Sequence, residues 1–302
     1  MNPMEMVGPV VGLGEILWDR LPDGPVPGGA PFNFAIQMAQ MGHAAAMVSA
    51  VGADQDGALI VELARARGVD VSGVATDPSH PTGAVDVVVD AAGKATYTFL
   101  DNVAWDALVP TARQLALMAK ARAVCFGTLA QRTAVSREAA HALLGRATGA
   151  LVVCDLNFRQ GFHSAQVARM SLERARWAKL NDDELPVLAG YLKLRPGTPA
   201  EQSRELLERY RLDLVALTMG AEGALLVTPG ETLRMGTPRV PVVDTVGSGD
   251  AFTAGLVTRH LEGGGVAEMM AFAIALAAIT ATRKGGTPEV ARAEVEDLAK
   301  RL

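Results

Sequence analysis

Short apolar segments typical of β-strands alternate with amphipathic segments typical of α-helices over most of the chain. The strand-like segments are residues 10–13, 46–51, 123–126, 150–155, 179–181 and 214–218. Helical spacing marks residues 31–41, 54–67, 136–147, 164–176, 182–189 and 200–210, and two long helices are expected to close the chain. Because strands that are apolar throughout are typical of sheets buried on both faces, this pattern predicts an α/β fold with a mostly parallel central sheet flanked by helices.

Two regions break this alternation. Residues 84–89 and 95–100 have the composition of a β-hairpin around a turn at 90–93, and residues 15–26 are extended and rich in turn-forming residues. Together they predict a small β layer beside the main sheet, inserted from about 15–28 and 84–105 into a single domain of residues 1–302. A small layer with an exposed edge can pair with a second copy, so a homodimer through this layer and a monomer are both open.

Composition and charge limit the partners. With 302 residues, 49% of them hydrophobic, the chain can bury a large core as two domains or as one large α/β unit. The formal net charge of −5 and the lack of a basic run argue against a nucleic-acid partner.

Cysteine use and the two most relevant apolar segments bear on the compartment. Cys125 and Cys154 each lie in an apolar run, which predicts buried thiols in a reducing compartment. Residues 1–8 lack the features of a signal peptide, and the most apolar helix, residues 266–282, is short for a bilayer span. We therefore expect a cytoplasmic protein with no membrane partner.

The turn Gly247-Ser248-Gly249-Asp250 is the most informative local feature. It follows an extended run and opens a helix in which apolar residues recur at helical spacing. Free backbone N–H groups and the positive end of the helix dipole meet at such a turn and attract anions, phosphate above all. A carboxylate beside an anion is costly unless it handles a proton, so Asp250 is a candidate base. The alternative is that Ser248 or Asp250 only caps the helix.

Polar groups that suit a sugar occur near the N-terminus. Gly28-Gly29 precedes a helix with Pro31 in its first turn, and Asn33 could bond a polyol while the glycines permit close approach of the backbone. Asp19 follows the first strand, where ligands bind in open α/β sheets. A plain loop-to-helix junction and a surface aspartate are the alternatives.

A second polar cluster ends the strand at 150–155. Strand alternation would put Asp155, Asn157 and Arg159 on one side, and a guanidinium there could clamp a phosphate or sugar oxygens. An ordinary polar loop explains the same residues.

The segments after the next two strands suit a nucleotide. Asn181 and Glu184 have the spacing of a helix capping box, which is a sufficient structural explanation. The functional alternative adds that both face a water-bound Mg²⁺ and nucleotide phosphates. Thr218, Gly220 and Gly223 follow another strand and could let the backbone approach a nucleotide, or could form a hairpin turn.

Several chemistries are excluded. The chain has no Gly-x-x-x-x-Gly-Lys-Ser/Thr motif, and the residues flanking Ser248 do not form a nucleophile elbow. The five histidines lie far apart, without zinc-site spacing.

Together these residues resemble the ribokinase-like, PfkB-type carbohydrate kinases over nearly the whole chain. Asp244-Thr245-Val246-Gly247-Ser248-Gly249-Asp250 resembles the family's C-terminal signature. Two segments resemble the family's N-terminal signature: Gly28-Gly29-x-x-x-Asn33 and Val51-Gly52-x-Asp54-x-x-Gly57. The segment Asn181-x-x-Glu184 resembles the family's magnesium and phosphate motif. Within the family the chain is most similar to the bacterial fructokinase branch, through segments 14–19, 102–106, 125–132 and 154–160.

The resemblance implies a role for each matching residue. Asp250 would be the catalytic base, Gly247, Ser248 and Gly249 the anion hole, and Arg159 a neighbour of the transferred phosphate. The sugar would be held by Asp19, Gly28, Gly29 and Asn33 beneath a lid that includes Phe99 and Trp105. The nucleotide would lie along Asn181, Glu184, Thr218, Gly220 and Gly223, with Mg²⁺ held through water by Glu184. A potassium-like cation would be bound by Asp244 and the carbonyls of Val246, Ala281 and Gly286.

Two positions depart from the family pattern. Phe32 stands where relatives often carry Ala, which is expected to reshape the sugar pocket. Ile274 stands where many relatives have a polar residue near adenine, which questions the contact to the base.

The resulting expectation is an ATP-dependent sugar kinase that acts on a primary hydroxyl, with D-fructose as acceptor and fructose 6-phosphate as product. A kinase for 2-keto-3-deoxygluconate, for which Arg132 could supply a cation, or for a nucleoside is one alternative. A non-catalytic sugar-binding protein is the other, although such a protein would not need Asp250 beside an intact Gly-Ser-Gly turn.

Overall fold

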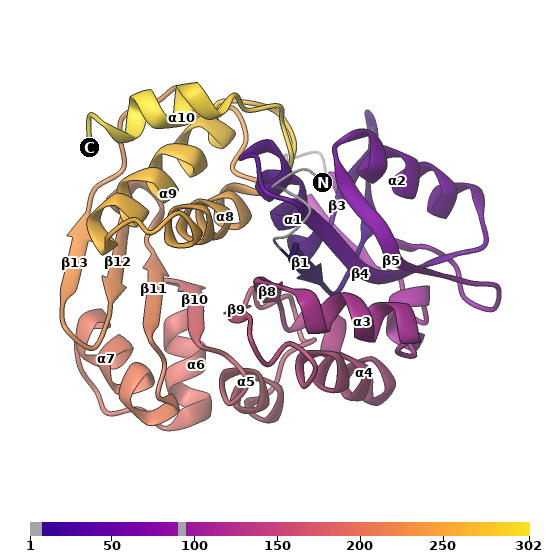
Figure 1. Cartoon of the computed structure of the whole chain (residues 1–302), viewed down its shortest axis with the longest axis horizontal. Coiled ribbons are helices and arrows are strands. Elements are labelled where there is room, and N and C mark those ends of the chain that lie inside the picture. The colour runs from indigo at the N-terminus through magenta and orange to yellow at the C-terminus, as the bar shows by residue number, and fades with distance from the viewer. Residues whose placement is uncertain (1–7, 90–94) are drawn as a thin grey trace.

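The computed structural model describes residues 8–89 and 95–302, and its main feature is a nine-stranded sheet (Figure 1). The strand order is β13-β12-β11-β10-β9-β8-β1-β4-β5. All pairs from β11 to β5 are parallel, whereas β12 and β13 add an antiparallel edge. The strands are β1 (Val10–Leu13), β4 (Ala45–Gly52), β5 (Val69–Asp77), β8 (Ala123–Phe126), β9 (Leu151–Asp155), β10 (Trp177–Asn181), β11 (Leu214–Thr218), β12 (Ala224–Val227) and β13 (Thr232–Met235).

Helices cover both faces of this sheet (Figure 1). One face carries α3 (Ala112–Lys120), α4 (Ala134–Leu144), α5 (Ala165–Leu172), α6 (Glu184–Leu192) and α7 (Pro199–Tyr210). The other carries α1 (Ala30–Gln40), α2 (Gln55–Ala66), α8 (Ser248–Leu261), α9 (Val266–Ala281) and α10 (Arg292–Ala299). In β11, Val215 and Leu217 pack in the first core, and Leu214 and Ala216 in the second. The predicted two-sided, mostly parallel α/β sheet is confirmed.

A four-stranded sheet lies beside the main one, in the order β3-β2-β6-β7. Its strands are β2 (Leu17–Leu21), β3 (Gly24–Gly28), β6 (Gly83–Val89) and β7 (Ala95–Phe99), which match the predicted β layer. The turn predicted at 90–93 lies outside the described residues. We call this four-stranded sheet the lid sheet.

Part of the N-terminal signature anchors the lid sheet to the body. The Asp54 carboxylate caps α2 through Gly57 N–H and accepts two further hydrogen bonds from the backbone and hydroxyl of Thr82, directly before β6. Gly57 lies so close to the Gly52 carbonyl that a Cβ would be 2.4 Å from its oxygen. These signature residues therefore have a structural role at the junction of the two sheets.

Some elements were not predicted. The sequence analysis missed β5, α3, β12, β13 and α10, and extended the helix at 164–176 beyond the observed end of α5 at Leu172. Short 3₁₀ turns, η2 (Ala104–Ala107), η3 (Leu129–Gln131) and η4 (Gly220–Glu222), were not predicted either. Residues of β13 alternate between exposed and partly buried, and β5 mixes buried, partly buried and exposed residues, so neither strand is a continuous apolar run.

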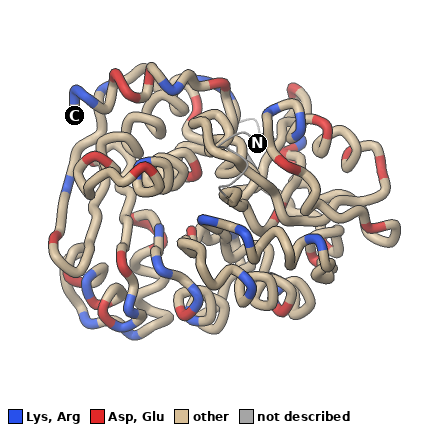
Figure 2. Tube along the Cα trace, in the orientation of Figure 1, with Lys and Arg blue, Asp and Glu red and all other residues tan. Residues whose placement is uncertain are grey.

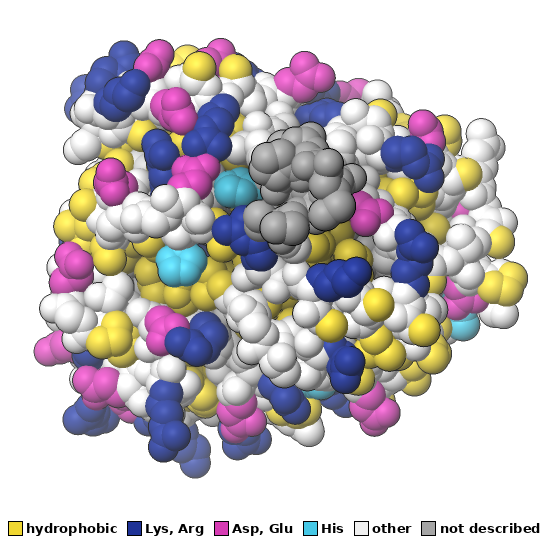
Figure 3. Space-filling view, in the orientation of Figure 1, with side chains coloured by type: hydrophobic (Ala, Val, Ile, Leu, Met, Phe, Trp, Pro, Cys, Tyr) yellow, Lys and Arg dark blue, Asp and Glu magenta, His cyan; other side chains and the backbone are white. Residues whose placement is uncertain are grey.

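The charged surface is mixed. Lys and Arg are spread among Asp and Glu along the trace in Figure 2, and side chains of both signs are interspersed on the face seen in Figure 3. Among the described helices, none combines the length and the apolar character needed to cross a membrane.

Candidate active site

Asp250 lies in the first turn of α8 and faces α1. Its carboxylate accepts a 2.8 Å hydrogen bond from the Asn33 side-chain amide, and the residue is only 9% exposed. No side chain caps α8, and its N-cap, Gly247, has a left-handed backbone with φ of 75°. The plain capping alternative is therefore wrong: the N-terminal amides of α8 are not used by Ser248 or Asp250 side chains.

The surroundings of Asp250 raise its pKa to about 6. Burial is the largest cause, and the negative charge of Asp155 adds to it. Lys179, the Asn33 hydrogen bond and Arg159 act in the opposite direction. A carboxyl with this pKa is ionised at neutral pH and can still accept a proton from an alcohol that is losing it.

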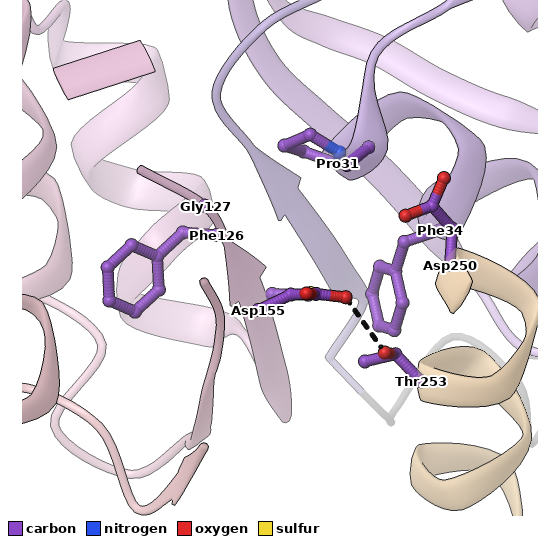
Figure 4. A pocket seen from close by; sticks show the side chains of 9 residues that line it. Pro31, Phe34, Phe126, Gly127, Asp155, Asp250 and Thr253 are labelled. Carbon is purple, nitrogen blue, oxygen red and sulfur yellow. Dashed lines mark hydrogen bonds between the residues drawn. The ribbon is translucent and has the colours of Figure 1, made fainter. Parts of the chain in front are cut away.

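A narrow pocket adjoins Asp250 between the first turns of α1 and α8 and the ends of β8 and β9 (Figure 4). Its lining residues are Ala30, Pro31, Phe34, Cys125, Phe126, Gly127, Asp155, Asp250 and Thr253. In this view Asp250 and Asp155 come from opposite sides, and Thr253 bonds Asp155. The pocket lies at the carboxyl ends of parallel strands, where ligands bind in open α/β sheets.

A buried ion pair supports the Gly-Ser-Gly turn from beneath. Lys179 Nζ lies 3.1 Å from both carboxylate oxygens of Asp155, which also accepts a 3.1 Å hydrogen bond from the Thr253 hydroxyl. The ammonium is so close to Gly249 that a Cβ there would be 2.8 Å from it. Burial lowers the pKa of Lys179, but the charges of Asp155, Glu184 and Asp250 outweigh it and raise the pKa.

Sequence reasoning assigned no role to Lys179, although a lysine within an otherwise apolar strand was the available signal.

The predicted sugar side gathers around Gly28 and Gly29. Asp19 follows β1 in the chain and lies in β2 of the lid sheet, within the segment predicted to belong to the small β layer. Its carboxylate packs against Gly28, where a Cβ would lie 2.4 Å from Oδ2. Burial raises the pKa of Asp19 to about 6, while the positive charge of Arg159 lowers it. Glu15, which the sequence analysis did not single out, is buried beside Gly29.

Arg159 lies in a constrained loop after β9. The flanking residues Asn157 and Gln160 have positive φ angles of 42° and 44°, and the Phe158 N–H donates a 2.7 Å bond to Glu184. The predicted alternation of Asp155, Asn157 and Arg159 on one side of a strand is wrong, because the strand ends at Asp155. Arg159 is exposed, yet its charge acts on Glu15, Asp19 and Asp250.

Asn181 and Glu184 form the predicted capping box. Glu184 N–H donates to the Asn181 side chain, and Asn181 N–H donates to Glu184, both at 2.8 Å. Burial is the main cause that raises the pKa of Glu184. Each Glu184 oxygen accepts one backbone N–H, so each retains a lone pair for a metal-bound water. Carboxylate oxygens with free lone pairs are donors of the kind that can hold Mg²⁺ through water. No cluster of three His, Cys, Asp or Glu suited to a metal occurs among the described residues.

The remaining residues predicted to bind the nucleotide divide into two groups. Thr218 ends β11 beside Asn181 of β10, and Gly220 lies exposed in the following 3₁₀ turn. Gly223, by contrast, packs against β13, where a Cβ would be 1.9 Å from the Met235 carbonyl oxygen. The β11–β12 connection is the hairpin named as an alternative, and Gly223 is needed to close it.

The residues predicted to hold a monovalent cation join two loops. Asp244 accepts hydrogen bonds from the N–H groups of Val246 and Gly285, and the Ala281 carbonyl accepts from Val243 and Asp244. Gly286 touches Gly247, where a Cβ would be 2.1 Å from the Gly286 oxygen. The predicted ligands thus come from two adjoining segments, and oxygen donors of this kind suit a hard cation.

Of the aromatic residues expected at the lid, Trp105 is buried and Phe99 is partly buried, and both pack against neighbouring side chains. Trp105 is 2% exposed and packs beneath the Arg132 guanidinium, 4.3 Å from the ring centroid. Phe99 meets Phe162 edge to face at 5.6 Å, which joins β7 to the Arg159 loop. Phe32, expected to reshape the sugar pocket, and Ile274, expected near adenine, both lie in core clusters, and neither lines the pocket beside Asp250.

Comparisons with known proteins agree with this geometry. The family model described as pfkB family carbohydrate kinase matches residues 25–292. A fructokinase from Rhizobium leguminosarum bv. trifolii is 32% identical over 260 residues, which cover 81% of this chain and 77% of the relative.

Two solved structures share the ribokinase-like fold. Fructokinase from Xylella fastidiosa with bound ATP has a TM-score of 0.85 at 26% identity, covering 97% of this chain and 98% of its own. Fructokinase from Vibrio cholerae O395, in a fructose, ADP and calcium ion bound form, has a TM-score of 0.81 at 23% identity, covering 97% and 99%. The chain therefore belongs to the pfkB family of carbohydrate kinases, which transfer a phosphoryl group to an alcohol group of a sugar.

Proposed function

We propose that this enzyme transfers the γ-phosphoryl group of Mg·ATP to the primary hydroxyl of D-fructose, giving fructose 6-phosphate and ADP. The names of its relatives support this acceptor, since the Rhizobium and Xylella proteins are both fructokinases. ATP and fructose bound in the two solved structures support the pair of substrates. We also propose that the main sheet and the lid sheet work as one kinase unit.

Asp250 is the observation that carries the proposal. Its ionised carboxylate would take the proton of the sugar hydroxyl as the hydroxyl oxygen bonds to the γ-phosphorus and the bond between that phosphorus and the bridging oxygen of ADP breaks. The N–H groups of residues 247–250 at the start of α8 would stabilise the phosphoryl oxygens, together with Arg159. Mg²⁺ held through Glu184 would supply charge neutralisation on the phosphates when bound.

The lid sheet would exclude water from the transferring group. Gln160 donates a 2.6 Å hydrogen bond to the Tyr97 carbonyl, so the Arg159 loop already touches β7. Asp19, Gly28, Gly29 and Asn33 would orient the sugar under this sheet, with Phe99 and Trp105 supporting it. A potassium-like cation at Asp244, Val246, Ala281 and Gly286 would fix the anion hole, and a homodimer would form through the lid sheet.

The charge pattern favours a neutral sugar over a sugar acid. Arg132, the candidate partner for an anionic acceptor, is paired with Asp106 through two hydrogen bonds of 2.6 and 2.7 Å, and its side chain is 5% exposed. A guanidinium held in this way is already neutralised by a carboxylate. The carboxyls of Glu15, Asp19 and Asp250 would repel an acid.

The test is ADP release measured with a panel of D-fructose, 2-keto-3-deoxygluconate, ribose and adenosine. We expect D-fructose to give the highest kcat/KM. Asp250→Asn should lower kcat by about 10²–10⁴ without loss of thermal stability, because the base is lost while the side chain keeps its size. Asp297→Asn, which changes an exposed carboxylate on α10, is the control. Sugar binding without turnover by the wild type would favour a non-catalytic protein, and near-normal turnover of Asp250→Asn would remove the proposed base.

A further inference from the structure

Glu15 is a buried carboxylic acid that the proposed reaction does not use. It lies between β1 and β2, and only 3% of the residue is exposed. Its Oε1 accepts a 3.2 Å hydrogen bond from the N–H of Ala30, the first residue of α1. Its Oε2 is buried and has no hydrogen-bond partner within the described residues. Burying a carboxyl with so few hydrogen bonds costs folding free energy, which indicates that Glu15 has a specific role.

The contact is made where α1 begins. Gly29, the N-cap, has φ of 109°, and a Cβ there would lie 2.5 Å from the Glu15 carbonyl oxygen. No side chain caps this helix from within, so Glu15 satisfies one of its free N–H groups from another segment. The backbone of Glu15 and its side chain together fix the position of the first turn.

That first turn carries the group that orients the base. Asn33 N–H donates a 2.8 Å bond to the Gly29 carbonyl, and the Asn33 side chain donates a 2.8 Å bond to Asp250 Oδ2. A continuous chain of contacts therefore runs from Glu15 through the start of α1 and Asn33 to Asp250. Asn33 is also wedged against Gly286, where a Cβ would be 2.9 Å from its amide nitrogen, so it has little freedom to compensate for a shift of the helix.

We propose that Glu15 is a positioning residue for the catalytic base: its carboxyl anchors the start of α1 so that Asn33 holds Asp250 toward the acceptor hydroxyl. This role rests on the proposed function, because Asp250 needs to be positioned only if it is the base in phosphoryl transfer. Misplacement of a reacting group by about 1 Å can cost about 10²-fold in rate. Glu15 acts through α1 and touches no reacting atom.

The electrostatics agree with a group close to the base. The pKa of Glu15 is raised to about 7, with burial as the largest cause and the charge of Asp250 adding to it, while hydrogen bonding by the backbone of Glu15 and of Ala30 and the charge of Arg159 lower it. The groups that act on Asp250 come from several elements: Asp155 on β9, Arg159 in the loop after β9, Lys179 on β10 and Asn33 on α1. A neutral carboxyl, a carboxylate and an amide can each accept the Ala30 N–H through the side-chain oxygen, and the carboxylate accepts most strongly.

Two substitutions at Glu15 separate the hydrogen bond from the charge. Glu15→Gln removes the charge and keeps the acceptor, whereas Glu15→Ala removes both. We expect Glu15→Ala to lower kcat with D-fructose by about 10- to 100-fold with an unchanged KM for ATP, and Glu15→Gln to restore kcat to within about 3-fold of the wild type. Glu268→Ala is the control, because Glu268 also accepts a backbone N–H at the start of a helix, at 2.9 Å from Gly265, the N-cap of α9, and lies far from this site in the chain.

A titration of Asp250 by carboxyl ¹³C NMR tests the same inference without turnover. The Asn33 hydrogen bond lowers the pKa of Asp250, so Asp250 should titrate at a higher pH in Glu15→Ala than in Glu15→Gln. If Glu15→Ala does not fold, Ala30→Pro removes the donor instead, at a helical position where proline is tolerated. Equal kcat and equal titration in the two Glu15 variants would overturn the inference. An inactive wild type with the expected titration difference would instead overturn the proposed function alone.

Discussion

The Asn33 amide is the only side-chain hydrogen-bond donor given to Asp250 by the described residues, and it lowers the pKa of a carboxyl that burial raises to about 6. Since kcat/KM reports ionisations of the free enzyme, we expect its value for D-fructose to fall as the pH drops below about 6. Asn33→Ala removes a hydrogen bond that stabilises the ionised form of Asp250, so the pKa of Asp250 should rise. The fall of kcat/KM at low pH, the acidic limb of the pH profile, should then begin at a higher pH.

The measurement is kcat/KM for D-fructose between pH 5 and 8, scaled to the plateau of each variant so that a loss of sugar affinity does not disguise the shift. Gln40→Ala, which changes an amide at the far end of α1, is the control. An acidic limb that stays in place in Asn33→Ala would contradict the assignment of that limb to Asp250.

Residues differ in how far their environment can be predicted from the sequence. The Gly-Ser-Gly-Asp turn and the helix that follows are local features, so they were predictable from consecutive residues and from the helical spacing of the apolar residues after Asp250. Lys179 and Glu15 were not, because the partners that make their burial tolerable are distant in sequence: Asp155 for Lys179, and Ala30 for Glu15. Isolated charged residues in apolar surroundings show that a partner is needed without showing which.

At the scale of elements, Asp155 joins β9 to β10 and to α8. Its carboxylate bonds Lys179 on β10 and Thr253 on α8, and all three side chains are buried. Asp155→Asn should leave the Lys179 charge unpaired, and breaking a buried pair in this way destabilises a protein by about 3–5 kcal/mol. The double variant Asp155→Asn with Lys179→Met should recover most of that loss, because no uncompensated charge is left.

Urea unfolding of the wild type, both single variants and the double variant measures this coupling. Asp213→Asn, which removes a carboxylate from the largely exposed pair with Arg176, is the control and should change the free energy of unfolding by less than about 1 kcal/mol. Additive single effects, with no recovery in the double variant, would mean that Lys179 and Asp155 do not depend on each other.

Elements buried on both faces were the most predictable. The strands β1, β8 and β9 are short apolar runs, and their predicted bounds agree with the structure to within one residue. The strand β13 was missed because it lies at the antiparallel edge, where its residues alternate between exposed and partly buried positions. The strand β12 is a buried apolar run of four residues and was missed although that signal was present. The lid sheet was predicted as a layer, but its parallel pair β2–β6 joins segments some 60 residues apart and gave no local signal.

At the scale of the whole molecule, the candidate site concentrates negative charge within a chain of net charge −5. Burial is the first cause of the raised pKa of Glu15, Asp19 and Asp250, to about 7, 6 and 6. A fold that keeps such groups buried gives up stability at neutral pH for an arrangement that serves the reaction. Ligands that bring positive charge, such as a metal-bound nucleotide, would offset part of this loss.

Glu15 allows this compromise to be measured. Its folded-state pKa of about 7 lies above the usual value of 4.5, so the protonated form favours folding: the contribution is complete below about pH 4.5 and is lost as the pH rises through 7. Replacing it by Gln removes that dependence. We expect the difference in free energy of unfolding, Glu15→Gln minus wild type, to be larger at pH 8 than at pH 5.5, by at most about 3 kcal/mol. Urea unfolding of the ligand-free proteins at both pH values checks this, with Glu268→Gln as the control. A difference between Glu15→Gln and wild type that is the same at both pH values would show that the folded protein already holds Glu15 ionised throughout this range, as the unfolded chain does, and would contradict the raised pKa.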